Sequence, residues 1–282
     1  MKDLTHFKPV DYLLVGHITQ DLTDSGSRLG GTATFSGLTA RILGHSVGIV
    51  TSCHTSTDFH IYENIQICNF PSEESTTFRN ISSEGSRTQY LYHKALPLDM
   101  TSIPAAWKKT PIIHLGPVAN EIDSDIINHF PDSLMLLTPQ GWLRQVDPQG
   151  KVHPIPWNLP PELTAKATAI VLSSEDIQDD EDQITELARH SNILIVTENK
   201  YGARVYWRGD VRRFSAPQVD LVDATGAGDI FAAAFFSRLA QTRDPWESTR
   251  FAVKLSASSV TRSYLQSIPT KDEIASALVD IN

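Results

Sequence analysis

The chain has 282 residues, of which 40% are hydrophobic and 20% are charged. These values are typical of a globular protein with a sizeable core, and they argue against extensive disorder. The formal net charge of −9 argues against broad binding to nucleic acids or anionic membranes, because their charge would repel the protein.

The cysteines and the N-terminal segment indicate the cellular setting. Cys53 and Cys68 provide neither a disulfide framework nor the spacing of a zinc site. The first residues lack a secretory pattern, and no stretch approaches the roughly 20 apolar residues of a membrane span. We therefore expect a cytoplasmic protein that binds neither membrane nor nucleic acid.

Short apolar runs alternate with helical patterns along much of the chain. Buried strands are predicted at 12–15, 47–51, 112–115, 134–137, 169–172 and 193–196. Helices are predicted at 33–43, 121–130 and 179–190. This alternation favours right-handed crossovers and a mostly parallel sheet that is covered on both faces.

The regions beyond residue 200 and between 76 and 93 differ from this alternation. Residues 203–207 and 211–215 flank Arg208-Gly209-Asp210 and predict an antiparallel hairpin at the sheet edge. Helices follow, with capping patterns at 244–247 and 270–273. Residues 76–81 and 87–93 predict a second hairpin, too polar for a parallel core. It either covers a ligand site at the strand ends or decorates the surface.

The segment Asp223-Ala224-Thr225-Gly226-Ala227-Gly228-Asp229 precedes a strongly apolar helix. A helix N-terminus offers unpaired N–H groups and partial positive charge to an anion such as phosphate. Asp229, in the first turn, has the chemistry of a base for an incoming hydroxyl. Taken alone, however, the pattern favours an acid that only complements the helix dipole and glycines that only allow tight packing.

Several segments together resemble the ribokinase (PfkB) family of carbohydrate kinases. Residues 223–229 match that family's signature, commonly D-T-x-G-A-G-D. Gly30-Gly31 after the first strand, the 196–203 segment and Ser267-Ile268-Pro269-Thr270 match further family features in the same order. The resemblance implies a single domain over residues 1–282. Its fold would be a three-layer α/β/α sandwich, with a small β lid formed by about 17–29 and 75–96.

The resemblance also implies residue roles around the reacting phosphate and the acceptor. Asp229 would be the general base, with the backbone of Gly226, Ala227 and Gly228 as the anion hole. Asp21 would accept hydrogen bonds from acceptor hydroxyls. Gly30 and Gly31 would let the backbone approach the acceptor.

The nucleotide-side roles follow from the same resemblance. Thr197, Asn199, Gly202 and Thr225 would contact the nucleotide, and Asn199 replaces a family glycine. Asparagine tolerates a left-handed backbone better than most residues, so this turn is expected to survive. The family's N-x-x-E motif corresponds here to Ser173-Ser174-Glu175-Asp176. Asp176 would therefore support Mg²⁺ indirectly or, alternatively, cap the following helix.

Two features of the acceptor side bear on the substrate. Arg144 would contact a phosphate or a substrate oxygen, or else lie on the surface. Thr32-Ala33-Thr34-Phe35 follows the glycine pair without the substrate-binding Asn of many family members, which weakens a ribokinase-like or fructokinase-like assignment. This segment together with Gln140, Arg144 and 147–148 is similar to inositol kinases of the family.

The predicted function is ATP-dependent phosphorylation of a hydroxyl on a small sugar, polyol or nucleoside, with Mg²⁺, by a monomer or a homodimer. One alternative is an inositol or sugar-phosphate kinase of the same family. Another is a non-catalytic relative that binds sugar or nucleotide, suggested by the altered positions 173–176 and 199. A P-loop kinase lacks its motif here, and a dinucleotide-dependent dehydrogenase would carry its glycines after the first strand.

Overall fold

Strand β1 (Tyr12–Val15) is buried along its whole length and lies between two other strands of a nine-stranded sheet. Its side chains alternate between two cores: Tyr12 and Leu14 pack on one face, and Leu13 and Val15 on the other. A strand buried on both faces is therefore a continuous apolar run, which is why the sequence predicts it well. The structure, a computed structural model, describes residues 7–83 and 86–278.

The nine strands run in the order β15-β14-β13-β12-β9-β8-β1-β4-β5. Besides β1 they are β4 (Val47–His54), β5 (Ile65–Ser72), β8 (Ile112–Leu115), β9 (Leu134–Leu137), β12 (Ala169–Ser173), β13 (Ile193–Thr197), β14 (Ala203–Trp207) and β15 (Asp210–Phe214). The strands from β12 to β5 pair in parallel, whereas β14 pairs antiparallel with both β13 and β15. The mostly parallel sheet and its antiparallel edge confirm the predicted α/β sandwich.

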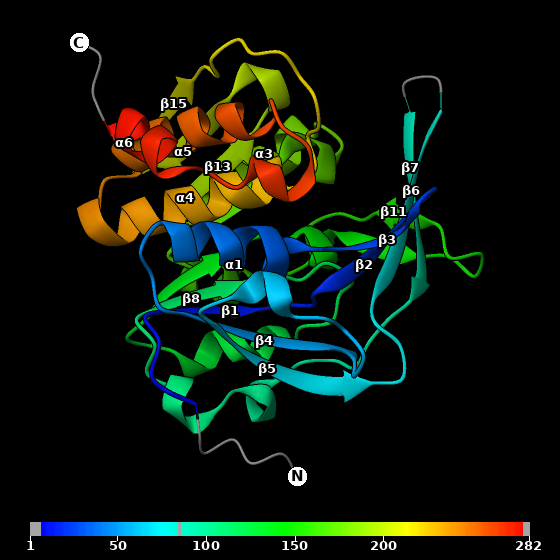
Figure 1. Cartoon of the computed structure of the whole chain (residues 1–282). Coiled ribbons are helices and arrows are strands. Elements are labelled where there is room, and N and C mark those ends of the chain that lie inside the picture. Colours follow the sequence, from blue (N-terminus) through cyan, green and yellow to red (C-terminus); the bar gives the residue numbers. More distant parts are fainter. Residues whose placement is uncertain (1–6, 84–85, 279–282) are drawn as a thin grey trace.

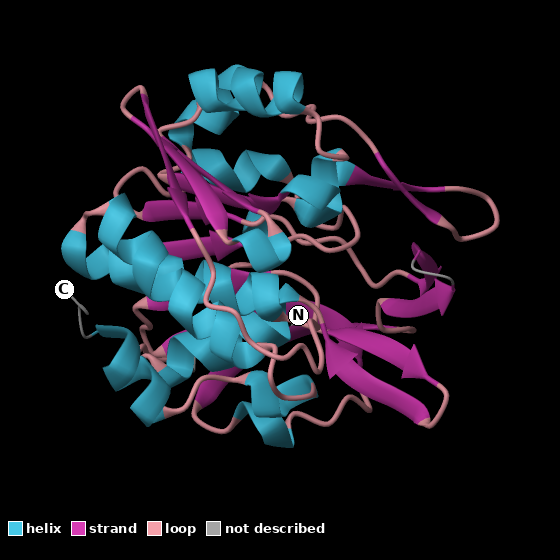
Figure 2. Ribbon diagram, turned by 90° about the horizontal axis from the view of Figure 1, so that it is seen from above, coloured by secondary structure: helices cyan, strands magenta, loops and turns pink. Residues whose placement is uncertain are grey.

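The helices cover both faces of this sheet (Figures 1 and 2). The α-helices are α1 (Thr32–Ile42), α2 (Pro161–Lys166), α3 (Glu181–His190), α4 (Ala227–Thr242), α5 (Pro245–Ser259) and α6 (Lys271–Leu278). Side chains of α1, α4, α5 and α6 share one core, and those of α3 belong to the other. Among the described residues, no helix is both long enough and apolar enough to cross a bilayer.

Short 3-10 helices join many of these elements. They are η1 (His60–Tyr62), η2 (Met100–Ser102), η3 (Ala105–Trp107), η4 (Ser124–His129), η5 (Gln140–Leu143), η6 (Ser174–Ile177), η7 (Asn199–Tyr201) and η8 (Tyr264–Ser267). The helix predicted at 121–130 is in fact the shorter η4, which begins after Asp123 caps it. Both predicted C-terminal caps are present, since Asp244 accepts from two backbone N–H groups and Thr270 and Glu273 bond reciprocally.

A separate four-stranded sheet, in the order β3-β2-β6-β7, projects from one end of the large sheet (Figure 1). Its strands are β2 (Thr19–Thr23), β3 (Gly26–Gly30), β6 (Thr77–Ser83) and β7 (Ser86–His93). The pairs β2–β3 and β6–β7 are antiparallel hairpins, and β2 joins them by pairing in parallel with β6. The turn residues 84–85 of the predicted 76–93 hairpin lie outside the described residues.

Several elements were absent from the sequence prediction, among them helix α2 and the strands β5, β10 and β11. Strand β5 lies at the sheet edge and contains Asn69 and Pro71, which interrupt its apolar pattern. Strands β10 (Arg144–Val146) and β11 (Val152–Pro154) form a small hairpin, and a bridge between Tyr90 and Lys151 connects it to β7. Arg144 is thereby brought beside the four-stranded sheet.

Candidate active site

Two helix N-termini meet at the centre of the candidate site, and each begins after a glycine in a left-handed conformation. Gly226 (φ 79°) precedes α4, and a Cβ there would lie 2.3 Å from Phe35 Cδ1 on α1. Gly31 (φ 82°) precedes α1, and a Cβ there would lie 2.7 Å from the backbone oxygen of His17. Side chains are excluded at both positions, so the two helices begin close together.

Asp229 lies in the first turn of α4, where the two helices meet. Its backbone oxygen accepts a hydrogen bond from Ser36 Oγ of α1 at 2.9 Å, and its carboxylate is hydrogen-bonded to the Thr32 side chain. Burial raises the pKa of Asp229 to about 6, with nearby Asp176 and Asp21 acting in the same direction. A carboxyl with this pKa is suited to accept a proton near neutral pH.

The first turn of α4 is open on the side away from α1. Ala227 N–H bonds to the Ala224 oxygen at 3.2 Å, whereas Gly228 is exposed and has nothing within 4 Å of where its Cβ would be. The following first-turn N–H groups occupy positions that a helix leaves without an internal acceptor. This end of α4 can therefore receive an anion.

The loop that leads into α4 is held by Asp223. Its carboxylate accepts from Thr225 N–H at 2.9 Å and from Tyr264 N–H at 3.2 Å, and it also accepts from the Thr225 side chain. The Thr225 hydroxyl thus stabilises the turn in this structure. A contact between Thr225 and a nucleotide stays a prediction.

Asp21 lies on β2 and is packed against Gly30 of β3. A Cβ at Gly30 would lie 2.4 Å from Asp21 Oδ2, so the glycine makes room for this carboxylate. Thr19 Oγ1 donates to Asp21 Oδ1 at 3.3 Å. The glycine pair predicted from the sequence therefore has two different functions: Gly30 accommodates Asp21, and Gly31 accommodates the backbone of His17.

Arg144 joins the four-stranded sheet to the loop after β12. Its Nη1 donates to Gln89 Oε1 on β7 at 2.9 Å, and its Nη2 lies 3.7 Å from Asp176 Oδ1. Gln89 in turn donates to Asn80 Oδ1 on β6 at 3.0 Å. Asn80 and Gln89 were not predicted from the sequence, because polar residues in a polar hairpin give no local signal.

Asp176 is engaged on both carboxylate oxygens. Its Oδ2 accepts from Ser173 N–H at 3.1 Å and completes a capping box with that residue, while Oδ1 faces Arg144 and Gln140. Within 7–83 and 86–278, no three His, Cys, Asp or Glu side chains are grouped to hold a metal ion. Magnesium keeps several waters and needs few protein ligands, so these residues fit an indirect role but not a protein cage.

The predicted nucleotide-side residues lie at and after the end of β13. Asn199 has the left-handed conformation (φ 50°) that its residue type allows, and its Nδ2 donates to Glu175 Oε1 at 2.7 Å. Thr197 Oγ1 donates to the Leu172 oxygen at 3.3 Å. Gly202 (φ 98°) is buried against Phe214, whose oxygen would lie 1.9 Å from a Cβ. These contacts fix the loops after β12 and β13 relative to each other.

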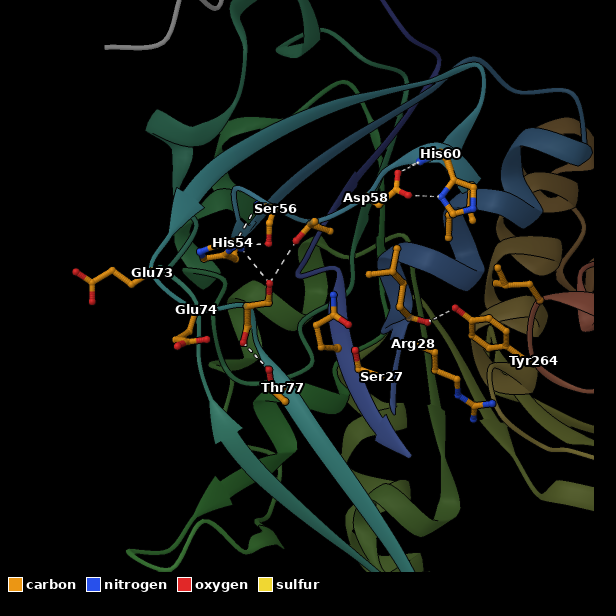
Figure 3. A pocket seen from close by; sticks show the side chains of 16 residues that line it. Ser27, Arg28, His54, Ser56, Asp58, His60, Glu73, Glu74, Thr77 and Tyr264 are labelled. Carbon is orange, nitrogen blue, oxygen red and sulfur yellow. Dashed lines mark hydrogen bonds and ion pairs between the residues drawn. The ribbon is translucent and has the colours of Figure 1, made fainter. Parts of the chain in front are cut away.

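Two cavities lie on opposite faces of the four-stranded sheet. The one in Figure 3, of about 760 Å³, is lined by Gln20, Thr77, Arg28, Tyr264 and the loop of His54 and Asp58, and by none of the predicted site residues. Side chains alternate along a strand, so Asp21 faces away from Gln20. The other cavity, of about 380 Å³, is lined by Phe78, which pairs with Asp21, and by Arg144. It is therefore on the side of the candidate site.

The fold and this site define a ribokinase-like α/β sandwich with a small accessory sheet. Residues 164–272 match the family described as "pfkB family carbohydrate kinase". The structure is similar to a pyrophosphate-dependent kinase of the ribokinase family in a sulfate complex (TM-score 0.79, 19% identity, 94% and 99% of the two chains). It is also similar to ribokinase from Thermotoga maritima (TM-score 0.72, 18% identity, 95% and 99%). The matched segment spans less than half of the chain, and the structural likeness shows a ribokinase-like fold.

Curated relatives match over shorter stretches. A fructokinase of Klebsiella pneumoniae is 31% identical over 129 residues, which are 40% of this chain and 42% of that protein. An inositol 3-kinase of Oryza sativa is 46% identical over 54 residues, which are 19% of this chain and 14% of that protein. The chain thus aligns with less than half of the length of each of these two relatives.

Proposed function

We propose that the protein transfers a phosphoryl group to a hydroxyl of a small sugar or polyol. The observation that carries this proposal is Asp229: a partly buried acid with a pKa of about 6 in the first turn of α4. The open N-terminus of α4 lies beside it, and Asp21 lies near enough to influence its charge. The match of residues 164–272 to the family described as "pfkB family carbohydrate kinase" supports the same chemistry.

In the proposed reaction, Asp229 accepts the proton of the acceptor hydroxyl. The hydroxyl oxygen forms a bond to the terminal phosphorus of the donor, and the bond from that phosphorus to the bridging oxygen breaks with its electron pair on the leaving group. The N–H groups of residues 226–228 stabilise the charge on the transferred phosphoryl oxygens. Bound Mg²⁺ would neutralise part of the donor's phosphate charge, with Asp176 supporting it through water.

The acceptor is proposed to bind between the four-stranded sheet and the end of the large sheet, so that the small sheet acts as a lid. Asp21 accepts hydrogen bonds from two neighbouring hydroxyls, as a carboxylate does well. Gly30 contributes by accommodating Asp21. Arg144, held by Gln89 and Asp176, forms the wall opposite. A polyol suits this mixture of acceptors and donors.

The proposed donor is ATP, bound along the loops after β12 and β13 by residues that include Thr197, Asn199 and Gly202. Structural similarity to a ribokinase of Arabidopsis thaliana in complex with ribose and ATP supports this donor (TM-score 0.71, 14% identity). A second donor is pyrophosphate, because a pyrophosphate-dependent kinase complexed with a pyrophosphate analog and myo-inositol has a TM-score of 0.78 with this chain. Both donors end in a phosphoryl group that the α4 N-terminus can hold.

The test is a matrix of acceptors and donors. Purified protein is incubated with fructose, ribose, myo-inositol, a nucleoside and a sugar phosphate, each with Mg²⁺ and either ATP or pyrophosphate. Formation of ADP or phosphate is measured against Asp229→Asn. Turnover that depends on the acceptor and on Asp229 supports the proposal. Saturable binding of sugar or nucleotide without turnover over the whole matrix would instead identify a non-catalytic relative.

A further inference from the structure

Four chain segments connect the large sheet with the four-stranded sheet, and His17 contacts all of them. It lies between β1 and β2, on the first connection. Its side chain bonds to Thr76, before β6, and to Leu96, after β7. Its backbone oxygen lies under Gly31, between β3 and α1. No other role in the proposed reaction has been given to this fully buried side chain.

The two ring nitrogens of His17 have defined roles. Nε2 lies 2.9 Å from the Leu96 backbone oxygen, which can only accept, so Nε2 carries the hydrogen. Nδ1 then accepts from the Thr76 hydroxyl at 2.6 Å. Burial lowers the pKa of His17, so the ring is neutral at pH 7 and this tautomer is available.

Thr76 extends the connection from His17 to the strands themselves. Its Oγ1 also accepts from Ala95 N–H at 3.0 Å, next to Leu96. Its backbone oxygen accepts from Gln20 N–H on β2 at 2.8 Å. Thr76 and the His17 ring therefore connect β2, the start of β6 and the segment after β7.

The backbone of His17 is fixed to the large sheet by a buried carboxylate. Glu121 is 1% exposed, and its Oε1 accepts from His17 N–H at 3.2 Å. Its Oε2 accepts from the N–H groups of Val118 and Ala119 at 3.0 and 2.7 Å. These three donors come from the ends of β1 and β8, so the carboxylate holds His17 to the body of the sandwich.

We propose that His17 is a positioning residue that fixes the four-stranded sheet above the site and so sets the distance from Asp21 to Asp229. This inference rests on the proposed function, because Asp21 is taken to bind the acceptor. Asp21 lies in β2, four residues after His17, and Thr19 between them donates to its carboxylate. The hydrogen-bond partners of His17 within the described residues are Glu121, Thr76 and Leu96, which lie outside the donor loops after β12 and β13.

A second buried histidine provides a matched control. His114 is also fully buried, and its nitrogens lie 2.9 Å from Tyr12 Oη and 2.9 Å from Thr138 Oγ1. Both partners belong to the large sheet or its end, and neither belongs to the four-stranded sheet. Each histidine ring makes two buried hydrogen bonds, but only those of His17 reach the segments that lead into and out of the four-stranded sheet.

The experiment compares His17→Gln, Thr76→Val, Thr76→Ser and His114→Gln by two readouts. His17→Gln retains a donor for Leu96 and loses the bond to Thr76. Thr76→Val keeps the His17 ring but loses both the bond to His17 and the bond from Ala95 N–H, and Thr76→Ser keeps both. The first readout is amide hydrogen exchange of peptides covering 19–23 and 77–81, compared with peptides covering β8, β9 and β12. The second is the KM for the acceptor and for the donor.

We expect His17→Gln and Thr76→Val to speed exchange in the four-stranded sheet about tenfold and to raise the acceptor KM about tenfold, with the donor KM unchanged. Thr76→Ser should restore both values, and His114→Gln should change neither. If His17→Gln does not fold, the comparison of Thr76→Val with Thr76→Ser tests the proposal. Unchanged exchange in Thr76→Val, or equal acceleration by His114→Gln, would overturn the proposal. If no acceptor is phosphorylated, the proposed function fails, while the exchange readout still tests His17.

Discussion

The start of α4 and the four-stranded sheet face each other across the candidate site, yet they are built in different ways. The α4 side works through backbone: a left-handed Gly226, small residues after it and one acid, all within seven consecutive positions. The four-stranded side works through side chains from separate segments, among them Asp21, Gln89 and Arg144. A site built from backbone groups needs particular small residues at consecutive positions. A site built from side chains can be formed by many different residues on separate segments.

This difference explains the pattern of the family match. The matched residues 164–272 include the start of α4 but none of β2, β3, β6 or β7. The matched segment thus contains the proposed phosphoryl-transfer side of the site, and the strands of the proposed acceptor side lie outside it. Variants on the two sides should therefore affect different kinetic constants.

The largest expected effect is that of Asp229→Asn. Without a base the acceptor hydroxyl keeps its proton in the ground state, so kcat should fall by about 10³-fold while ATP binding changes little. Steady-state kinetics and nucleotide binding measure the two quantities. Asp182→Asn is the control, because Asp182 is an exposed acid in the first turn of α3. Equal losses in both variants would mean that Asp229 acts only on the helix dipole.

Next is Gly226→Ala, which tests whether the start of α4 must touch α1. The new Cβ would collide with Phe35, so the first turn of α4 would shift and kcat should fall by about 10²-fold. The control is Gly209→Ala, at a similar φ of 82° in the β14–β15 turn but with nothing within 4 Å. Both variants share the backbone strain of about 1 kcal/mol, and only the first should lose turnover.

A smaller effect, confined to the acceptor, is expected for Asp21→Asn. The amide accepts fewer hydrogen bonds and carries no charge, so the acceptor KM should rise about 10- to 30-fold with the donor KM unchanged. Asp24→Asn, in the exposed turn of the same hairpin, is the matched control. A rise in the donor KM would contradict the division of the site into two sides.

The pH dependence should follow Asp229. Its pKa of about 6 means that the basic form is lost below that value, so kcat/KM should level off above about pH 7 and fall about fivefold between pH 6 and pH 5. The profile is measured between pH 5 and 8 with a saturating donor. A profile flat over this range would show that a different group accepts the proton.

The smallest effect concerns stability. Because burial raises the pKa of Asp229 above its ordinary 3.8, the protonated acid stabilises the folded state at low pH, and this contribution is lost as the pH rises through about 6. Asp229→Asn carries no charge, so at pH 8 it should be more stable than the wild type by roughly 1 kcal/mol, given the partial exposure of the side chain. The gain, measured by thermal unfolding, should vanish near pH 4.

Much of the fold could be predicted because its strands are buried on both faces. Runs such as 12–15 and 193–196 are continuous and apolar, so the sequence predicts both that they are strands and where these strands lie. The edge strand β5 could not be predicted in this way, since Asn69 and Pro71 interrupt its pattern. The segment 121–130 has the spacing of apolar residues typical of a helix, but it forms only the 3-10 helix η4. This spacing does not determine whether each backbone N–H bonds to the oxygen three or four residues before it.

In the candidate site, too, some residues could be predicted from the sequence and others could not. Asp229 and the glycines are visible in the sequence because their positions are consecutive. Thr32, whose side chain bonds to Asp229, is not visible, since its partner lies far along the chain. Asn80 and Gln89 are not visible, because polar residues in a polar hairpin give no local signal. The predicted roles of Asp21 and Arg144 remain predictions, and the structure adds the neighbours that hold both side chains.

The connection between β1 and β2 has a consequence for how this protein can vary in length. Residues 12–19 are all buried, and only Gly16, His17 and Ile18 separate the two strands. A single inserted or deleted residue in β1 would exchange the two cores, and one in the connection would carry Asp21 to the opposite face of its sheet. We therefore expect residues 12–19 to tolerate substitutions but neither insertions nor deletions, whereas the exposed turn at 24–25 can accept inserted residues.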